Sequence, residues 1–215
     1  MRYKSSEGQQ RSEGGNLFIK GEPNFICVIL IRSLARMPCD LRKTCELLRL
    51  SKINNLVIVK NNRAVKRMLE KIKTYVAYGT VSLEVLRELM YKKAMCTTDI
   101  NRHSEASGVK FQKDIAELER KKTKHTRKIK KYANVTNFSI WNHFQGKYSC
   151  IEELIEIIWY GKEDFKQVMK FLTVFHMEPP IKGYSKKKKV LNISEGGASG
   201  DWMESLDELV RKMIR

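Results

Sequence analysis

The chain has 215 residues. Its 42 Lys and Arg residues outnumber its 24 Asp and Glu residues, which gives a formal net charge of +18 and a pI near 9.7. A hydrophobic content of 42% excludes a wholly disordered basic tail, and the length suits one domain with additions or two small domains. The positive charge indicates contact with nucleic acid or an anionic membrane surface. Membrane insertion is not expected, because the longest strongly apolar run, residues 25–31, is far too short to cross a bilayer.

The N-terminal half is predicted to alternate strands with helices. Residues 1–16 are polar and rich in Gly, Ser and Gln, which predicts no signal peptide, and residues 1–24 are expected to form a flexible extension. The elements expected after it are a strand over 25–33, a helix from the Pro38 and Asp40 start signal to Asn54-Asn55, a strand over 56–60, a helix from Asn61-Asn62 to Ile72, and a short strand over 75–78 closed by Gly79. This order predicts a small sheet with two helices on one face.

The C-terminal half is predicted to be mainly helical. A third helix is expected from Ser82, residues 95–119 are less regular, and residues 120–131 hold eight basic residues in twelve. The elements expected next are a helix with a Ser149–Glu152 capping box that ends at Gly161, a helix over 165–172, a short strand over 173–177, a basic Gly-rich loop over 179–200, and a last helix capped by Asp201 with Trp202 on its buried face.

No catalytic or metal-binding pattern is present in the sequence. The chain has no nucleophile elbow, no phosphate-binding loop, no His-Glu-x-x-His and no dinucleotide fingerprint. The five cysteines form no Cys-x-x-Cys pair and the four histidines are scattered, which predicts reduced thiols and no zinc site. We therefore expect no enzyme activity, no catalytic residues, no metal, no cofactor and no small-molecule substrate.

Basic residues recur along the whole chain. The loop over 179–200 is the most informative stretch, because it combines four consecutive lysines with glycines whose N–H groups can turn toward an anion. Each basic cluster alone also fits a solvated helix face or a mobile arm, and it is their sum that indicates a polyanion. Tyr184 is a candidate for stacking on an unpaired base or for packing against the fold. The turn at Glu195-Gly196-Gly197 is either an ordinary loop tip or an anion site.

Several segments together resemble a family of large-ribosomal-subunit proteins, numbered thirty in bacteria and archaea and seven in eukaryotes. The matching segments are residues 41–50 (LRKTCELLRL), 75–79 (YVAYG), 86–93 (LRELMYKK), 149–158 (SCIEELIEII), 179–183 (PPIKG) and 195–200 (EGGASG). Their order is similar to the archaeal and eukaryotic branch, and the resemblance covers residues 25–94 and 135–215.

The resemblance implies an α+β, ferredoxin-like fold: a small antiparallel sheet with two helices (a β-α-β-α-β core), plus a helical extension and basic loops. The domain boundaries expected are a flexible extension over 1–24, the RNA-binding core with its third helix over 25–94, a divergent basic insertion over 95–134, and a helical extension with the Gly/Lys-rich loop and terminal helix over 135–215. The RNA-binding residues carried over from the family are Arg42, Lys43, Arg49, Lys92, Lys93, Lys182, Gly196 and Gly197. Charge and position add Arg32, Lys52, Arg63, Arg67, Arg127, Lys128, Tyr184, Lys186, Lys187, Lys188 and Lys189.

The function implied is a structural constituent of the large (60S-type) ribosomal subunit that binds and stabilises ribosomal RNA. Its expected partners are large-subunit ribosomal RNA and neighbouring ribosomal proteins, and its expected location is the cytoplasmic ribosome after nucleolar transit. The alternatives are a ribosome-assembly factor of the same family and a basic nuclease or DNA-binding module. The chain departs from the family pattern at two places. Asp201-Trp202 replace the family's Asn-Arg, which puts the RNA contact at that position in question, and residues 30–33 replace its Arg-x-Arg-Gly.

Overall fold

A computed structural model describes residues 10–11, 18–19, 23–97, 132–184 and 191–214. Five predicted features therefore lie wholly or largely outside the described residues: most of the N-terminal extension, most of the basic insertion, Arg127, Lys128 and the lysine run over 186–189. Two short strands of the N-terminal segment are described, β1 (Gln10–Arg11) and β2 (Phe18–Ile19), and they pair antiparallel.

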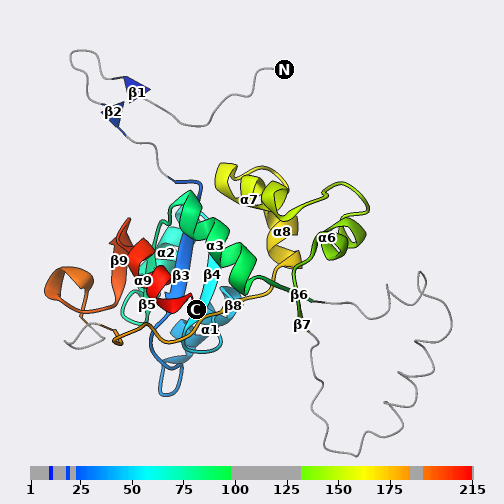
Figure 1. The fold of residues 1–215 in the computed structure, drawn as a ribbon. Helices are drawn as coiled ribbons and strands as arrows, with labels where there is room; N and C mark the ends of the chain where they lie inside the picture. Colours follow the sequence, from blue (N-terminus) through cyan, green and yellow to red (C-terminus); the bar gives the residue numbers. More distant parts are fainter. Residues whose placement is uncertain (1–9, 12–17, 20–22, 98–131, 185–190, 215) are drawn as a thin grey trace, which may run out of the picture.

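The centre of the fold is a five-stranded sheet with the order β8-β4-β3-β5-β9 (Figure 1). Its strands are β3 (Phe25–Leu30), β4 (Asn55–Lys60), β5 (Val76–Gly79), β8 (Phe175–His176) and β9 (Gly200–Met203). β3 runs antiparallel to both β4 and β5, β8 runs antiparallel to β4, and β9 runs parallel to β5. The C-terminal part of the chain thus adds one strand to each edge of a three-stranded core.

β3 is buried on both faces, which explains its unbroken apolar sequence. Successive side chains of a strand point to opposite faces. Ile26, Val28 and Leu30 belong to one hydrophobic core, and Cys27 and Ile29 belong to the other. Burial raises the pKa of the Cys27 thiol far above its ordinary value, so this cysteine is a core residue and no nucleophile.

Two helices cover the first face, as the sequence predicts. They are α1 (Cys39–Leu47) and α2 (Arg63–Ile72). Cys45 of α1 and Leu69 and Ile72 of α2 are almost fully buried against β3. These positions lie on the apolar helix faces that the sequence spacing marks, while the basic side chains of both helices point to solvent.

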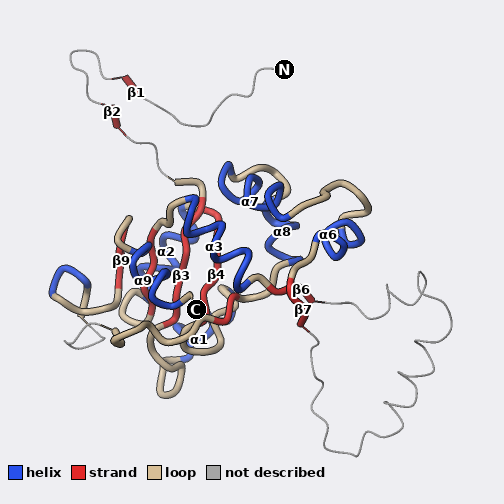
Figure 2. Tube along the Cα trace, viewed as in Figure 1, coloured by secondary structure: helices blue, strands red, loops and turns tan. Residues whose placement is uncertain are grey.

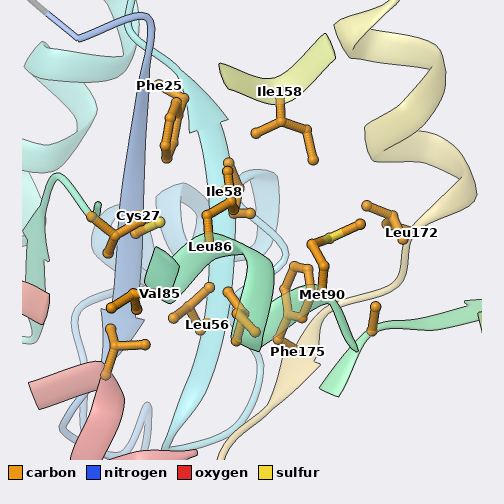
Figure 3. Packing of buried hydrophobic residues seen from close by; sticks show 14 of the residues in the cluster. Phe25, Cys27, Leu56, Ile58, Val85, Leu86, Met90, Ile158, Leu172 and Phe175 are labelled. Carbon is orange, nitrogen blue, oxygen red and sulfur yellow. The ribbon is translucent and has the colours of Figure 1, made fainter. Parts of the chain in front are cut away.

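The second face carries the third predicted helix and the C-terminal helices. These are α3 (Leu83–Lys93), α7 (Ile151–Tyr160), α8 (Phe165–Phe171) and α9 (Leu206–Met213). Figure 3 shows Leu86 and Met90 of α3 over the sheet, with Ile158 of α7 and Phe175 of β8 in the same cluster. One continuous core therefore joins the N-terminal elements to residues 150–214.

The remaining described elements are small (Figure 2). They are β6 (Met95–Thr97) and β7 (Tyr132–Asn134), which pair antiparallel at the base of the basic insertion, α6 (Asn137–His143), and the short 3₁₀ helix η1 (Ile193–Glu195). None of these four is among the elements that we expect from the sequence. α6 has a capping box between Thr136 and Ser139, a signature that lacks the Glu or Gln usually sought.

The α+β ferredoxin-like core is confirmed, and local predictions at two places are wrong. Asp201 is no helix cap and Trp202 is not on the last helix, because both lie in β9 and α9 begins only at Leu206. Asp201 accepts a hydrogen bond from the N–H of Met203. The partner of Ser149 is Glu153, which accepts from the Ser149 N–H at 2.8 Å. Glu152 instead pairs with Arg87 of α3 at 3.0 Å, so the predicted capping acid joins two helices.

Candidate nucleic-acid interface

The strand register brings five loops to one end of the sheet, which we call the basic end. It is the end where β3 and β8 finish and where β4, β5 and β9 begin, as the pairs Ile29 with Leu56, Leu30 with Val76, and Ala77 with Gly200 establish. The loops that meet there are residues 31–38, 48–54, 73–75, 177–184 and 191–199. α1 also lies near this end, because it connects the end of β3 to the start of β4 (Figure 1).

Most of the described candidate residues gather at this basic end. The group comprises Arg32, Arg42, Lys43, Arg49, Lys52, Lys182, Tyr184, Gly196 and Gly197. Lys92 and Lys93 adjoin it from the last turn of α3, where Lys93 pairs with Glu178 after β8. Arg63 does not join them, since α2 begins after the opposite end of β4, and Arg67 lies one turn further along the same helix.

Ion pairing distinguishes α3 and α9 from α1 and α2. The cations of α3 and α9 pair with acids, for example Arg211 with Glu84 at 3.1 Å and Lys92 with Glu88, one turn earlier on α3, at 2.7 Å. Lys166 and Lys170 of α8 are also exposed but form no ion pair with a described acid. Between described residues, Lys66 aside, no ion pair involves a cation of α1, of α2 or of the loops 31–38 and 48–54. The exposed side chains of Arg42, Lys43 and Lys52 are therefore available to bind the anionic groups of another molecule.

Arg32 lies at the end of the central strand on an aromatic ring. Its guanidinium carbon is 4.5 Å from the centre of the Tyr75 ring, a cation–π contact. The N–H groups of Ile31 and Arg32 both donate to the Tyr75 carbonyl, at 3.0 and 3.3 Å. Backbone and side chain together fix this cation at the basic end.

Arg49 has an internal role that its sequence position does not reveal. It follows α1 with a positive φ of 61°, and its Nη1 donates to the carbonyls of Met169 at 3.0 Å and Leu172 at 3.3 Å, at the C-terminal end of α8. Burial of the guanidinium lowers its pKa, though the residue as a whole is exposed. Arg49 thus joins the core to the C-terminal extension, and its contact with RNA stays a prediction.

Tyr184 is half-buried and bonded within the fold. Its hydroxyl donates to the Asn54 side-chain oxygen at 2.5 Å, and burial raises its pKa to about 12. The ring packs against the same core as β8. This arrangement is the packing alternative considered from the sequence, and stacking of Tyr184 on a base stays a prediction.

The Gly-rich turn bonds to itself. The N–H of Gly196 donates to the Ile193 carbonyl at 3.0 Å, and that of Gly197 donates to the Asn192 carbonyl at 2.9 Å. A Cβ on Gly197 would collide with the Leu191 carbonyl group, so glycine is required there by close backbone approach. These two N–H groups serve the turn and form no open anion site, which favours the loop-tip interpretation. RNA contact through other atoms of Gly196 and Gly197 stays a prediction.

Asp201 and Trp202, which follow this turn where the family pattern has Asn-Arg, make contacts within the fold. The Trp202 indole N–H donates to the Ala198 carbonyl at 2.9 Å, and its ring packs on the main core. Asp201 bonds to the Met203 N–H, as described above.

In the part of the chain that the structure describes, no three His, Cys, Asp or Glu side chains gather as a metal site. Within the same residues, no helix is long and apolar enough to span a bilayer.

A ferredoxin-like core whose sheet end carries exposed cations without ion pairs among the described residues defines a scaffold for binding a polyanion. The family model described as ribosomal protein L30p/L7e matches residues 26–76. The large ribosomal subunit protein uL30 of Encephalitozoon cuniculi (strain GB-M1) is 35% identical over 206 residues, which cover 96% of this chain and 73% of that protein. The protein uL30B of Schizosaccharomyces pombe (strain 972 / ATCC 24843) is 31% identical over 99% of this chain and 76% of its own. The chain belongs to the L30p/L7e family of ribosomal proteins, which confirms the resemblance found in the motifs.

Proposed function

We propose that this protein is a structural constituent of the large (60S-type) ribosomal subunit, where it binds and stabilises ribosomal RNA. The observation that carries the proposal is the 35% identity, over 96% of the chain, to a protein named as part of that subunit. The role is structural and non-catalytic, as in the family to which the chain belongs. Its partners are large-subunit ribosomal RNA and the ribosomal proteins beside it.

The segments of the chain have different roles in RNA binding at and around the basic end. The elements over 25–94 fix the orientation of the molecule on RNA, because α1 and its flanking loops present Arg42, Lys43 and Lys52, which have no acidic partner among the described residues. Residues 135–215 extend the sheet at both edges and hold this end rigid from the second face. The segments 1–24 and 95–134 add polar and basic side chains that contact RNA beyond the core and neutralise its phosphates.

The cell biology that follows is that of a subunit protein. The protein transits the nucleolus during assembly and then remains in cytoplasmic ribosomes. The relatives reported above are named as subunit proteins, and neither is named as an assembly factor.

Sedimentation of cell extract through a sucrose gradient tests this proposal. A structural constituent co-sediments with large subunits, with whole ribosomes and with polysomes, and it stays there after a wash at moderate salt. Presence only in nuclear pre-ribosomal fractions, with none in polysomes, would contradict the proposal and indicate the assembly-factor alternative.

A further inference from the structure

We infer that Arg32 and Tyr75 form a stacking platform for one unpaired nucleobase at the basic end. The inference rests on the proposed function and adds to it the kind of RNA that this position recognises. A platform of this kind reads the exposed face of a base, whereas the surrounding lysines read only phosphate charge.

The Tyr75 ring is positioned by packing against the core and by hydrogen bonds of the Tyr75 backbone. Tyr75 packs on the core that lies between the sheet and α1 and α2, and its N–H donates to the Ile72 carbonyl at the end of α2 at 2.8 Å. The two backbone bonds from Ile31 and Arg32 to its carbonyl prevent the strand end from moving away. The fold therefore sets the position of the Tyr75 ring by core packing and by these backbone bonds.

The cation lies over that ring, with its guanidinium carbon 4.5 Å from the ring centre. A guanidinium is planar, so when it stacks on the ring its opposite face and its N–H edge are available to a ligand. Arg32 keeps part of its surface in solvent, and no ion pair between described residues involves it. A base placed on the outer face would complete a stack of ring, guanidinium and base, with phosphate in reach of the N–H edge.

Only an unpaired base offers the face that this stack requires. Bases within a duplex are covered on both faces by their neighbours, whereas bulged or loop bases can be splayed out onto a protein surface. The loop around Arg32 suits such an approach, because Ser33 and Arg36 beside it are exposed. A bulge or single-stranded loop in RNA is accordingly the expected partner.

The experiment compares two RNA hairpins that differ by one bulged adenosine, bound to the full chain. The wild-type chain should bind the bulged hairpin about tenfold more tightly than the fully paired one, a typical effect of one stacked base. Arg32→Lys keeps the positive charge but removes the planar guanidinium group. This variant should therefore lose most of the preference for the bulged hairpin. Arg211→Lys is the matched control on α9, and it should keep the preference.

Each outcome has one meaning. If Arg32→Lys weakens both hairpins equally or leaves the preference intact, Arg32 acts as a point charge and the platform is disproved. If the wild-type chain binds both RNAs with equal affinity, the inference fails while the proposed function stands. If the wild-type chain binds neither RNA nor ribosomal RNA fragments, the proposed function itself fails. Tyr75→Leu, with its folding checked by thermal unfolding, should abolish the preference as Arg32→Lys does.

Discussion

At the scale of single residues, Arg49 shows that a basic side chain in a ribosomal family motif can serve the fold itself. Its two carbonyl acceptors belong to a helix more than 100 residues further along the chain. We expect Arg49→Ala to lower the free energy of unfolding by about 1.5–3 kcal/mol, the usual effect of losing hydrogen bonds to a charged group. Arg63→Ala, an exposed position on α2, should change it by less than about 0.5 kcal/mol. Urea unfolding of both variants measures the difference, and equal stabilities would remove Arg49 from this role.

Tyr184 gives a pH dependence at the same scale. Its pKa is raised to about 12 in the folded protein, against an ordinary value of 10.0. The unfolded chain therefore loses this proton first, so the stability that the neutral hydroxyl contributes is complete below about pH 10 and is lost as pH rises toward about 12. We expect a late tyrosinate absorbance step that Tyr184→Phe removes, together with a shallower loss of stability in alkali. If Tyr184→Phe instead removed absorbance near pH 10 and left the late step in place, Tyr184 would titrate normally and this account of its pKa would be wrong.

At the scale of elements, the Gly-rich turn sets the position of β9. Gly197 lies against the Leu191 carbonyl, whereas Gly183 has a positive φ of 76° but no atom within 4 Å of the place that a Cβ would take. Gly183→Ala should therefore cost about 1 kcal/mol through backbone conformation alone. Gly197→Ala should cost clearly more, because the turn must open. Thermal unfolding compares the two, and a smaller loss for Gly197→Ala would contradict the packing described here.

The elements that the sequence predicts best are those whose patterns are local. β3, β4 and the apolar faces of α1 and α2 follow from runs and spacings within about ten residues of each other. β9 could not be found in this way, because Gly200 and Asp201 disfavour a strand and only pairing with β5 makes one. Glu152 has the spacing of a cap, and only the position of α3 explains why it binds Arg87 instead.

At the scale of the whole molecule, the sequence predicts the excess of positive charge, and the pairing of the strands determines where on the molecule the basic residues gather. Arg32, Arg42, Lys43 and Lys52 could each be named from their residue types, yet their meeting at one end depends on the antiparallel pairing of β3 with β4 and β5. The ion pairs Arg87–Glu152 and Arg211–Glu84 are equally beyond sequence patterns, since each joins residues far apart in the chain. The net charge of +18 is thus less informative than the distribution of cations with and without ion pairs over the described residues.

The central claim is that this basic end, and not total charge, binds ribosomal RNA. The most direct test measures the affinity of the full chain for large-subunit ribosomal RNA across a range of salt concentrations. Two triple variants that each remove three positive charges are compared: Arg42→Ala, Lys43→Ala and Lys52→Ala at the basic end, and Arg87→Ala, Lys162→Ala and Arg211→Ala among the ion-paired cations. The first should reduce the slope of log affinity against log salt by about 2–3, and the second by less than about 1. Equal losses in the two variants, or a larger loss in the second, would contradict the account.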